Sequence, residues 1–157
     1  SRCGALDPGV LLHLLAQGED ENSLQELLYH RSGLLGISGI SSDMLTLRAS
    51  QDARARLAID HYAYRIAQEV GRMAACLGGL AALVFTAGIG EKDAELRAQV
   101  VQQLAPLFDL RLDDKANRRH AERISSADSP RALLVIPTDE ESMLARHAWR
   151  LYQETPA

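Results

Sequence analysis

Apolar residues recur at helical spacing through residues 52–77, the longest patterned stretch of the sequence. Steps of three and four place such residues on one face of a helix. The seven alanines of this stretch favour a helix and permit close contacts with it. Gly78 and Gly79 follow directly and end it. We therefore predict one long amphipathic helix. Its apolar face carries Ile59, Tyr62, Ile66, Val70, Met73 and Leu77.

Two shorter helices are predicted before it. Asp7 followed by Pro8 indicates a helix N-terminus, because aspartate caps the first turn and proline lacks only an N–H that would stay unpaired there. Asn22 or Ser23 is expected to cap a second helix that stops before Gly33.

The apolar run of residues 34–40 is interrupted by two glycines. We predict a buried strand here, whose glycines let another group approach the backbone closely. Residues 41–50 then predict a turn and a short helix capped by a serine or an aspartate.

Two apolar runs in the second half of the sequence, residues 81–86 and 131–137, predict strands. The first leads through a glycine turn to a predicted helix over residues 93–104. The second leads to a helix that begins at Thr138, where Glu141 three residues later completes a capping box. Alternating strands and helices indicate an α/β layer structure.

Composition fits a single globular domain and excludes several classes of protein. The chain has 157 residues, of which 46% are hydrophobic, enough to bury a core. A net charge of −4 without a long basic run argues against nucleic acid or an anionic membrane as the main partner. Cys3 and Cys76 form no metal or disulfide motif.

No apolar run is long enough to span a membrane, and no secretory leader opens the sequence, so we expect a cytoplasmic protein. Because the sequence starts at Ser1, we expect it to continue a longer chain.

Three junctions between elements carry polar or glycine residues: 39–43, 86–91 and 137–141. Ligands of open α/β sheets bind beyond the carboxyl ends of strands, so these junctions are candidate sites. Gly88 and Gly90 let backbone N–H groups approach a phosphate, or alternatively make only a tight turn.

The other candidate residues are charged. Glu140 lies among carboxylates at a helix start. Its negative charge either interacts favourably with the helix dipole or coordinates Mg²⁺. Arg2 either neutralises a transferring phosphoryl group or is a surface arginine. Asp43 either caps a helix or holds a nucleoside.

Four segments of the sequence together resemble the C-terminal half of the acetate kinase family, which has propionate and butyrate kinases as relatives. They are "SRCGALDPG", "GLLGISGISSDM", "AIDHYAYRIAQEVGRMAACLGGLAALVFTAGIGE" and "VIPTDEESMLARH". The resemblance implies the fold of acetate and sugar kinases, heat-shock chaperone ATPases and actin, with a mixed sheet flanked by helices. Residues 1–157 would then form a single C-terminal, nucleotide-side domain, without the N-terminal catalytic half.

The resemblance also implies roles for individual residues. Arg2 would be catalytic and stabilise the transferring phosphoryl group, and Glu140 would contact Mg²⁺. Leu45 stands where the family usually has arginine, and Lys92 where it usually has asparagine. The residues implied to bind ATP or ADP are Asp43, Met44, Leu45, Gly88, Ile89, Gly90, Glu91 and Lys92.

The implied reaction is reversible phosphoryl transfer between ATP and acetate or a similar short-chain carboxylate, giving ADP and acetyl phosphate. Such a transfer depends on positioning and on neutralising charge. We expect the 157-residue chain to be inactive by itself, because the resemblance covers one side of a cleft. An alternative is a non-catalytic assembly module that dimerises through the long alanine-rich helix. The resemblance implies a homodimer in either case.

Overall fold

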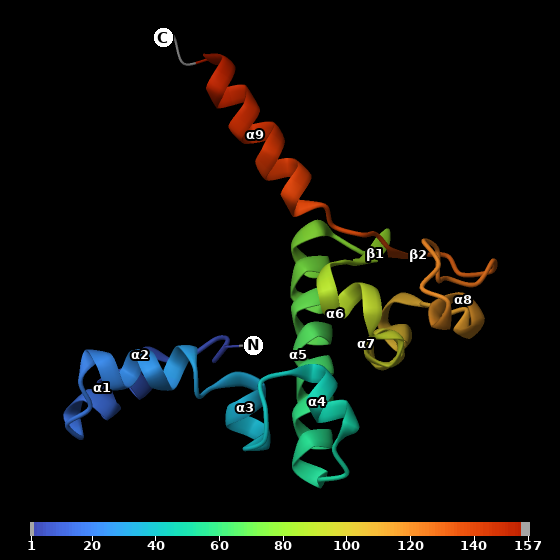
Figure 1. The fold of residues 1–157 in the computed structure, drawn as a ribbon. Helices are drawn as coiled ribbons and strands as arrows, with labels where there is room; N and C mark the ends of the chain where they lie inside the picture. Colours follow the sequence, from blue (N-terminus) through green and yellow to red (C-terminus); the bar gives the residue numbers. More distant parts are fainter. Residues whose placement is uncertain (1, 155–157) are drawn as a thin grey trace. The chain divides into compact units, whose positions relative to one another are not determined.

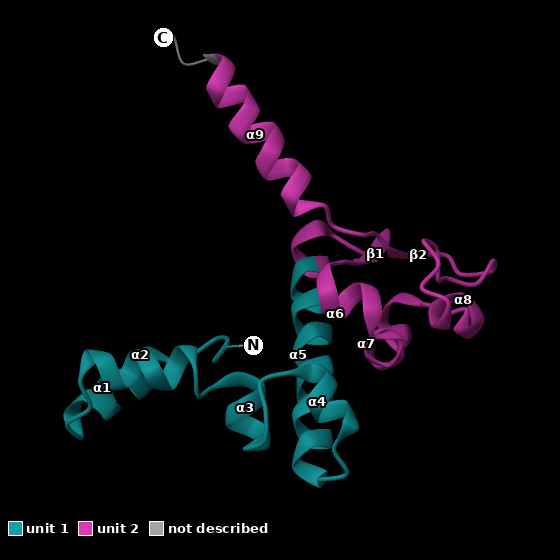
Figure 2. Cartoon of the chain, in the orientation of Figure 1, with its two compact units in different colours: residues 1–73 teal, residues 74–157 magenta. Residues whose placement is uncertain are grey.

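The structure is a computed structural model that describes residues 2–154. The chain divides into two compact units, residues 1–73 and residues 74–157 (Figure 2). Figure 1 shows the order of the elements, with helices in both units and the two strands in the second. The assignment of residues 1–157 to one C-terminal domain stays a prediction.

The first unit begins with two capped helices. In α1 (Pro8–Ala16), the Asp7 carboxylate accepts a hydrogen bond from the Gly9 N–H at 2.6 Å, as predicted. In α2 (Glu21–Tyr29), the cap is Asp20, and its side chain and that of Ser23 each accept the other's backbone N–H. The predicted cap at Asn22 or Ser23 was therefore wrong by two or three residues, because Ser23 is the partner of the capping residue.

Residues 34–40 do not form the predicted strand; they lie mostly in α3 (Gly33–Ser38). Gly39 ends this helix with a φ of +64°, a conformation that favours glycine. The buried Ser38 hydroxyl accepts the N–H of Ile40 at 3.0 Å and so closes the turn. A seven-residue apolar run is too short for its periodicity to separate a strand from a helix, and these local bonds decide for the helix.

The remaining helices of the first unit agree with the predictions. Helix α4 (Met44–Ala49) is short and follows its cap, Asp43. Helix α5 (Ala53–Leu77) is the long helix predicted from the apolar repeat, and its alanines at 55, 58, 63 and 67 are buried. Every helix of residues 2–154 is too short or too polar to cross a membrane.

The N-terminus of α5 is fixed by Asp52. Its carboxylate accepts hydrogen bonds from the backbone N–H and the guanidinium of Arg54, at 2.8 Å each. These bonds from Arg54 lower the pKa of Asp52 from 3.8 to about 2.

We predict that this carboxylate stabilises the fold in a pH-dependent way. Because its pKa is lower in the folded state, the stabilisation is complete above pH 3.8 and is lost as the pH falls to about 2. The melting temperatures of the wild-type chain and of Asp52→Asn, measured from pH 5 to pH 2, should therefore converge as the pH falls. A constant difference across this range would contradict the prediction.

The second unit contains a two-stranded parallel sheet. Strands β1 (Ala82–Phe85) and β2 (Ala132–Val135) pair in register, with Ala82 opposite Ala132 and Phe85 opposite Val135. An antiparallel bridge between Arg123 and Leu134 adds a second pairing direction.

Helices α6 (Ala87–Lys92), α7 (Ala94–Phe108), α8 (Asp114–Arg118) and α9 (Glu140–Glu154) complete the second unit. Helices α6 and α9 each follow a strand. The sequence predicts a glycine turn where α6 lies, and the helix predicted over residues 93–104 corresponds to α7. The buried core of this unit contains Leu96, Val100, Val101, Leu104, Ile124 and Leu133.

Candidate functional site

The predicted glycine turn is the short helix α6, which begins directly after β1. A Cβ added at Gly90 would lie 3.3 Å from the carbonyl carbon of Phe85, so glycine lets α6 fold back closely on the strand. A Cβ added at Gly88 would meet nothing within 4 Å, and Gly88 is exposed. Gly90 therefore serves the turn, whereas Gly88 is exposed, and the approach of its backbone to a phosphate stays a prediction.

We predict that alanine at these two positions has different effects. Gly90→Ala is expected to destabilise the chain by about 1 kcal/mol, because the Phe85 backbone must shift. Gly88→Ala should leave the melting temperature nearly unchanged, because the space is open. Thermal melting of both variants tests this, and equal losses of stability would contradict it.

A fully buried arginine holds α6 from the side of α7. The Arg97 side chain has 0% exposure. Its Nη1 donates to the carbonyl oxygens of Gly90 at 2.7 Å and Glu91 at 2.9 Å. These carbonyls belong to the last turn of α6, where backbone oxygens lack helical partners and a positive charge is favourable. Arg97 therefore fixes the end of the glycine segment.

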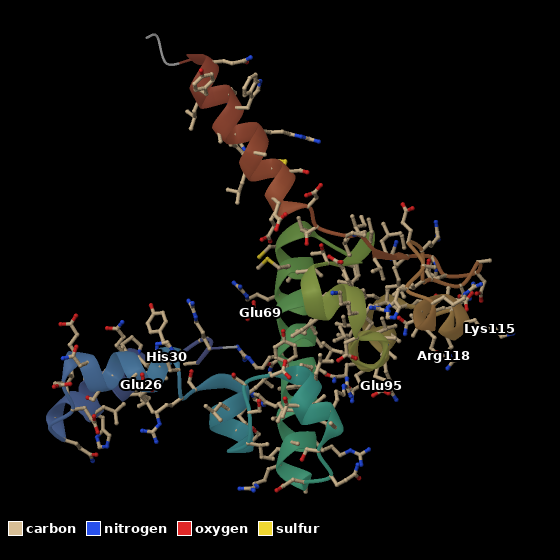
Figure 3. All side chains as sticks on the ribbon, viewed as in Figure 1. Glu26, His30, Glu69, Glu95, Lys115 and Arg118 are labelled. Carbon is tan, nitrogen blue, oxygen red and sulfur yellow. The ribbon has the colours of Figure 1, made fainter. Side chains whose placement is uncertain are left out.

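The other donors of Arg97 point to α8 and the residues after it. Nε donates to the Asn117 side-chain oxygen at 2.7 Å, and Nη2 donates to the Asn117 carbonyl at 2.8 Å and to His120 Nδ1 at 3.1 Å. All five N–H groups of the guanidinium are thus used. Burial lowers the pKa of Arg97, and the nearby Asp93 opposes this effect. By contrast, Lys115 and Arg118 on α8 are exposed (Figure 3).

The acidic segment at the start of α9 is capped differently from the prediction. The Asp139 carboxylate accepts the Ser142 N–H at 3.0 Å, and hydrogen bonds from Ser142 lower the pKa of Asp139. The predicted capping box of Thr138 with Glu141 was wrong, because the helix begins at Glu140, two residues later than expected. Asp139 is therefore the residue that caps α9.

Thr138 is instead bound to the glycine segment. The Glu91 carboxylate accepts the Thr138 N–H at 2.9 Å and its hydroxyl at 3.2 Å. These bonds, the backbone one foremost, lower the pKa of Glu91. The contact joins two candidate segments that lie 47 residues apart in the sequence.

Glu140 is exposed and lines a hollow of about 410 Å³ with Thr138, Asp139, Met143, Leu144 and His147. Within residues 2–154, no three His, Cys, Asp or Glu side chains form a cluster that could hold a metal ion. Mg²⁺ commonly binds one or two protein carboxylates together with water and substrate phosphates. An exposed carboxylate such as that of Glu140 fits this way of binding.

Asp43 is the cap of α4, as one of the two readings predicted. Its carboxylate accepts the N–H and the hydroxyl of Thr46, both at 2.8 Å. These bonds lower the pKa of Asp43. The next two residues differ: Met44 is 5% exposed and packs in the core, whereas Leu45 is 79% exposed. Of the two side chains, that of Leu45 is the one accessible to a ligand.

Arg2 lies in the first unit, with its guanidinium 4.8 Å from the centre of the Tyr29 ring. It lines a hollow of about 510 Å³ together with residues of α3 and α5, among them His61, Tyr62 and Arg65. Burial raises the pKa of Tyr62. The Arg65 guanidinium is paired with Glu69 at 3.7 Å and donates a hydrogen bond to the Gln68 side-chain oxygen at 2.8 Å. Arg65 is not among the residues predicted from the sequence, because tertiary packing decides which side chains line this hollow.

The predicted site residues fall into two sets. Within the second unit, the segments of Gly88–Lys92 and Thr138–Glu140 are joined by the Glu91 contact. Arg2 and Asp43 belong to the first unit. The roles of these residues, including those of Ile89 and Lys92, stay predictions.

Arg97 was missed in the sequence, although a signal was present. It occupies the apolar face of α7, at helical spacing from Val100, Val101 and Leu104, all buried. An arginine among apolar positions of one helix face is rarely buried unless its donors are paired.

The sequence was compared with models of protein families and with curated proteins. The model of the acetokinase family matches residues 1–146. The chain is 54% identical over 154 residues to an acetate kinase of Rhodopseudomonas palustris strain TIE-1, covering 96% of this chain and 38% of that protein. It is 48% identical over 149 residues to an acetate kinase of Rhizobium meliloti, covering 94% of this chain and 38% of that protein. The chain thus spans about 38% of the length of the curated relatives it matches.

Solved structures agree. A crystal structure of the Porphyromonas gingivalis acetate kinase matches 96% of this chain and 39% of its own, with a TM-score of 0.85 and 37% identity. A propionate kinase from Francisella tularensis matches 92% of this chain and 38% of its own, with a TM-score of 0.84 and 34% identity. The fold is therefore the α/β fold of the acetate and propionate kinases, as the sequence predicts. The chain belongs to the acetokinase family.

Proposed function

We propose that the chain is the nucleotide-side part of an acetate kinase, which transfers a phosphoryl group reversibly between ATP and acetate. The observation that carries this proposal is the 54% identity with an acetate kinase over 96% of the chain. We infer that the reaction takes place in the cytoplasm, where ATP and ADP are available.

In this proposal, the residues act by binding and by neutralising charge. The accessible backbone at Gly88 and the adjacent Ile89 and Gly90 approach the nucleotide, and Lys92 supplies a cation near its phosphates. Asp43 fixes the start of α4, so that Leu45 faces the adenosine. Arg2 neutralises charge on the transferring phosphoryl group.

Mg²⁺ would be held by Glu140 together with nucleotide phosphates, and when bound it would neutralise the charge of those phosphates. The protein's part is to keep the Glu140 carboxylate exposed at the start of α9, which Asp139 does by capping the helix.

We also propose that α5 contributes to a homodimer. Leu57 and Tyr64, exposed by 59% and 50%, lie seven residues apart on this helix. Residues spaced by seven lie on the same side of a helix and suit a helix–helix interface. This surface is shared with the alternative of an assembly module. An assembly module, however, has no need of an exposed Glu140 or an accessible Gly88.

The test is a chimera in which this chain replaces the matching segment of the R. palustris acetate kinase. Formation of acetyl phosphate from ATP and acetate is expected from the chimera and not from the 157-residue chain by itself. A folded, dimeric chimera without activity would contradict the kinase and favour the assembly module. Turnover by the 157-residue chain would contradict the division of the site between two parts of the protein.

A further inference from the structure

The Glu91 carboxylate is committed to a contact within the protein. One oxygen, Oε1, accepts both hydrogen bonds from Thr138. A carboxylate that accepts hydrogen bonds holds its partners more firmly than a neutral acceptor would. The same negative charge would be unfavourable directly beside the phosphates of a nucleotide. The Glu91 carboxylate therefore suits contacts within the protein better than a contact with phosphates.

Both ends of this contact lie next to candidate site residues. On one side, the Glu91 carbonyl is held by the buried Arg97, which also holds the carbonyl of Gly90. On the other side, Thr138 stands two residues before Glu140. Arg97 fixes the backbone of α6 at Gly90 and Glu91. The hydrogen bonds from Thr138 to Glu91 therefore also restrict the position of residues 138–140.

We propose that Glu91 is a positioning residue whose carboxylate ties the Thr138–Glu140 segment to α6, so that Glu140 meets the Mg²⁺–nucleotide complex from a fixed place. This inference rests on the proposed function for its metal and nucleotide, and on the two hydrogen bonds for its geometry. It assigns Glu91 a different task from the nucleotide contact implied by the family resemblance.

The first measurement needs no ligand. Hydrogen exchange of the Thr138 amide is followed by NMR in the 157-residue chain. Glu91→Ala is expected to speed this exchange at least about tenfold, and Glu91→Gln, which keeps an acceptor oxygen, much less. Glu122→Ala, a change at an exposed glutamate of the same unit, should stay within about twofold of wild type. An unchanged Thr138 amide, or equal acceleration of the α7 core, overturns the proposal.

The second measurement uses the chimera with the R. palustris enzyme. Glu91→Ala is expected to raise the Mg²⁺ concentration for half-maximal activity by about tenfold, with KM for acetate unchanged and partial recovery in Glu91→Gln. A rise in KM for ATP without a change in Mg²⁺ dependence would make Glu91 a nucleotide ligand and overturn the proposal.

A second variant guards against loss of folding. Thr138→Val removes one of the two hydrogen bonds and keeps the backbone one, so it should shift the Mg²⁺ dependence in the same direction by a smaller factor. No shift in this folded variant and in Glu91→Gln overturns the proposal even where Glu91→Ala does not fold. An inactive wild-type chimera in which the Thr138 amide still responds to Glu91→Ala contradicts the proposed function while supporting the contact.

Discussion

Replacing Arg2 with alanine in the chimera is expected to lower kcat about a thousandfold, which corresponds to about 4 kcal/mol of transition-state stabilisation. An arginine beside the transferring phosphoryl group acts mainly on the transition state, so KM for ATP should change much less. Arg2→Lys should recover part of the activity, because lysine keeps the charge but not the planar fork.

The matched control is Arg31→Ala, which removes another exposed guanidinium of the same unit. It should leave kcat within about twofold of wild type, as surface substitutions do. Tyr29→Leu offers a second measurement: its ring lies 4.8 Å from the Arg2 guanidinium, and its loss should lower kcat severalfold. A kcat for Arg2→Ala within tenfold of wild type would show that Arg2 is an ordinary surface residue.

The long and strongly periodic parts of the fold could be predicted from the sequence. Helix α5 has an apolar repeat over 25 residues, so its period is unambiguous. The strand-to-helix junctions at Gly88 and Glu140 follow from the order of apolar runs and glycines. Helix α3 could not be predicted, because a run of seven residues fits either period and Gly39 acts as a helix terminator only once the helix exists.

The contacts that organise the candidate site could not be predicted, because they depend on tertiary structure. The Glu91–Thr138 contact requires that β1 and β2 pair in parallel, which brings their following segments to the same end of the sheet. The role of Arg97 depends on which carbonyls lie beside it. Local sequence shows the chemistry available at each junction, whereas the pairing register decides which junctions meet.

Glu140→Gln in the chimera is expected to lower activity at a fixed Mg²⁺ concentration by about a hundredfold, because it removes the negative charge proposed to hold the metal. Excess Mg²⁺ should restore part of the loss. The melting temperature should change little, since Glu140 is exposed and a charge in the first helical turn contributes about 0.3–1 kcal/mol.

Glu141→Gln distinguishes the two interpretations of the acidic segment, which are a metal ligand at Glu140 and a helix-dipole interaction alone. Both residues lie in the first turn of α9, so both substitutions remove the same helix-dipole interaction and should cost similar stability. If Glu140 is the metal ligand, Glu141→Gln keeps nearly full activity and the wild-type Mg²⁺ dependence. If Glu140→Gln and Glu141→Gln instead keep equal activity, the acidic segment only stabilises the start of α9. The metal must then be held elsewhere in the protein.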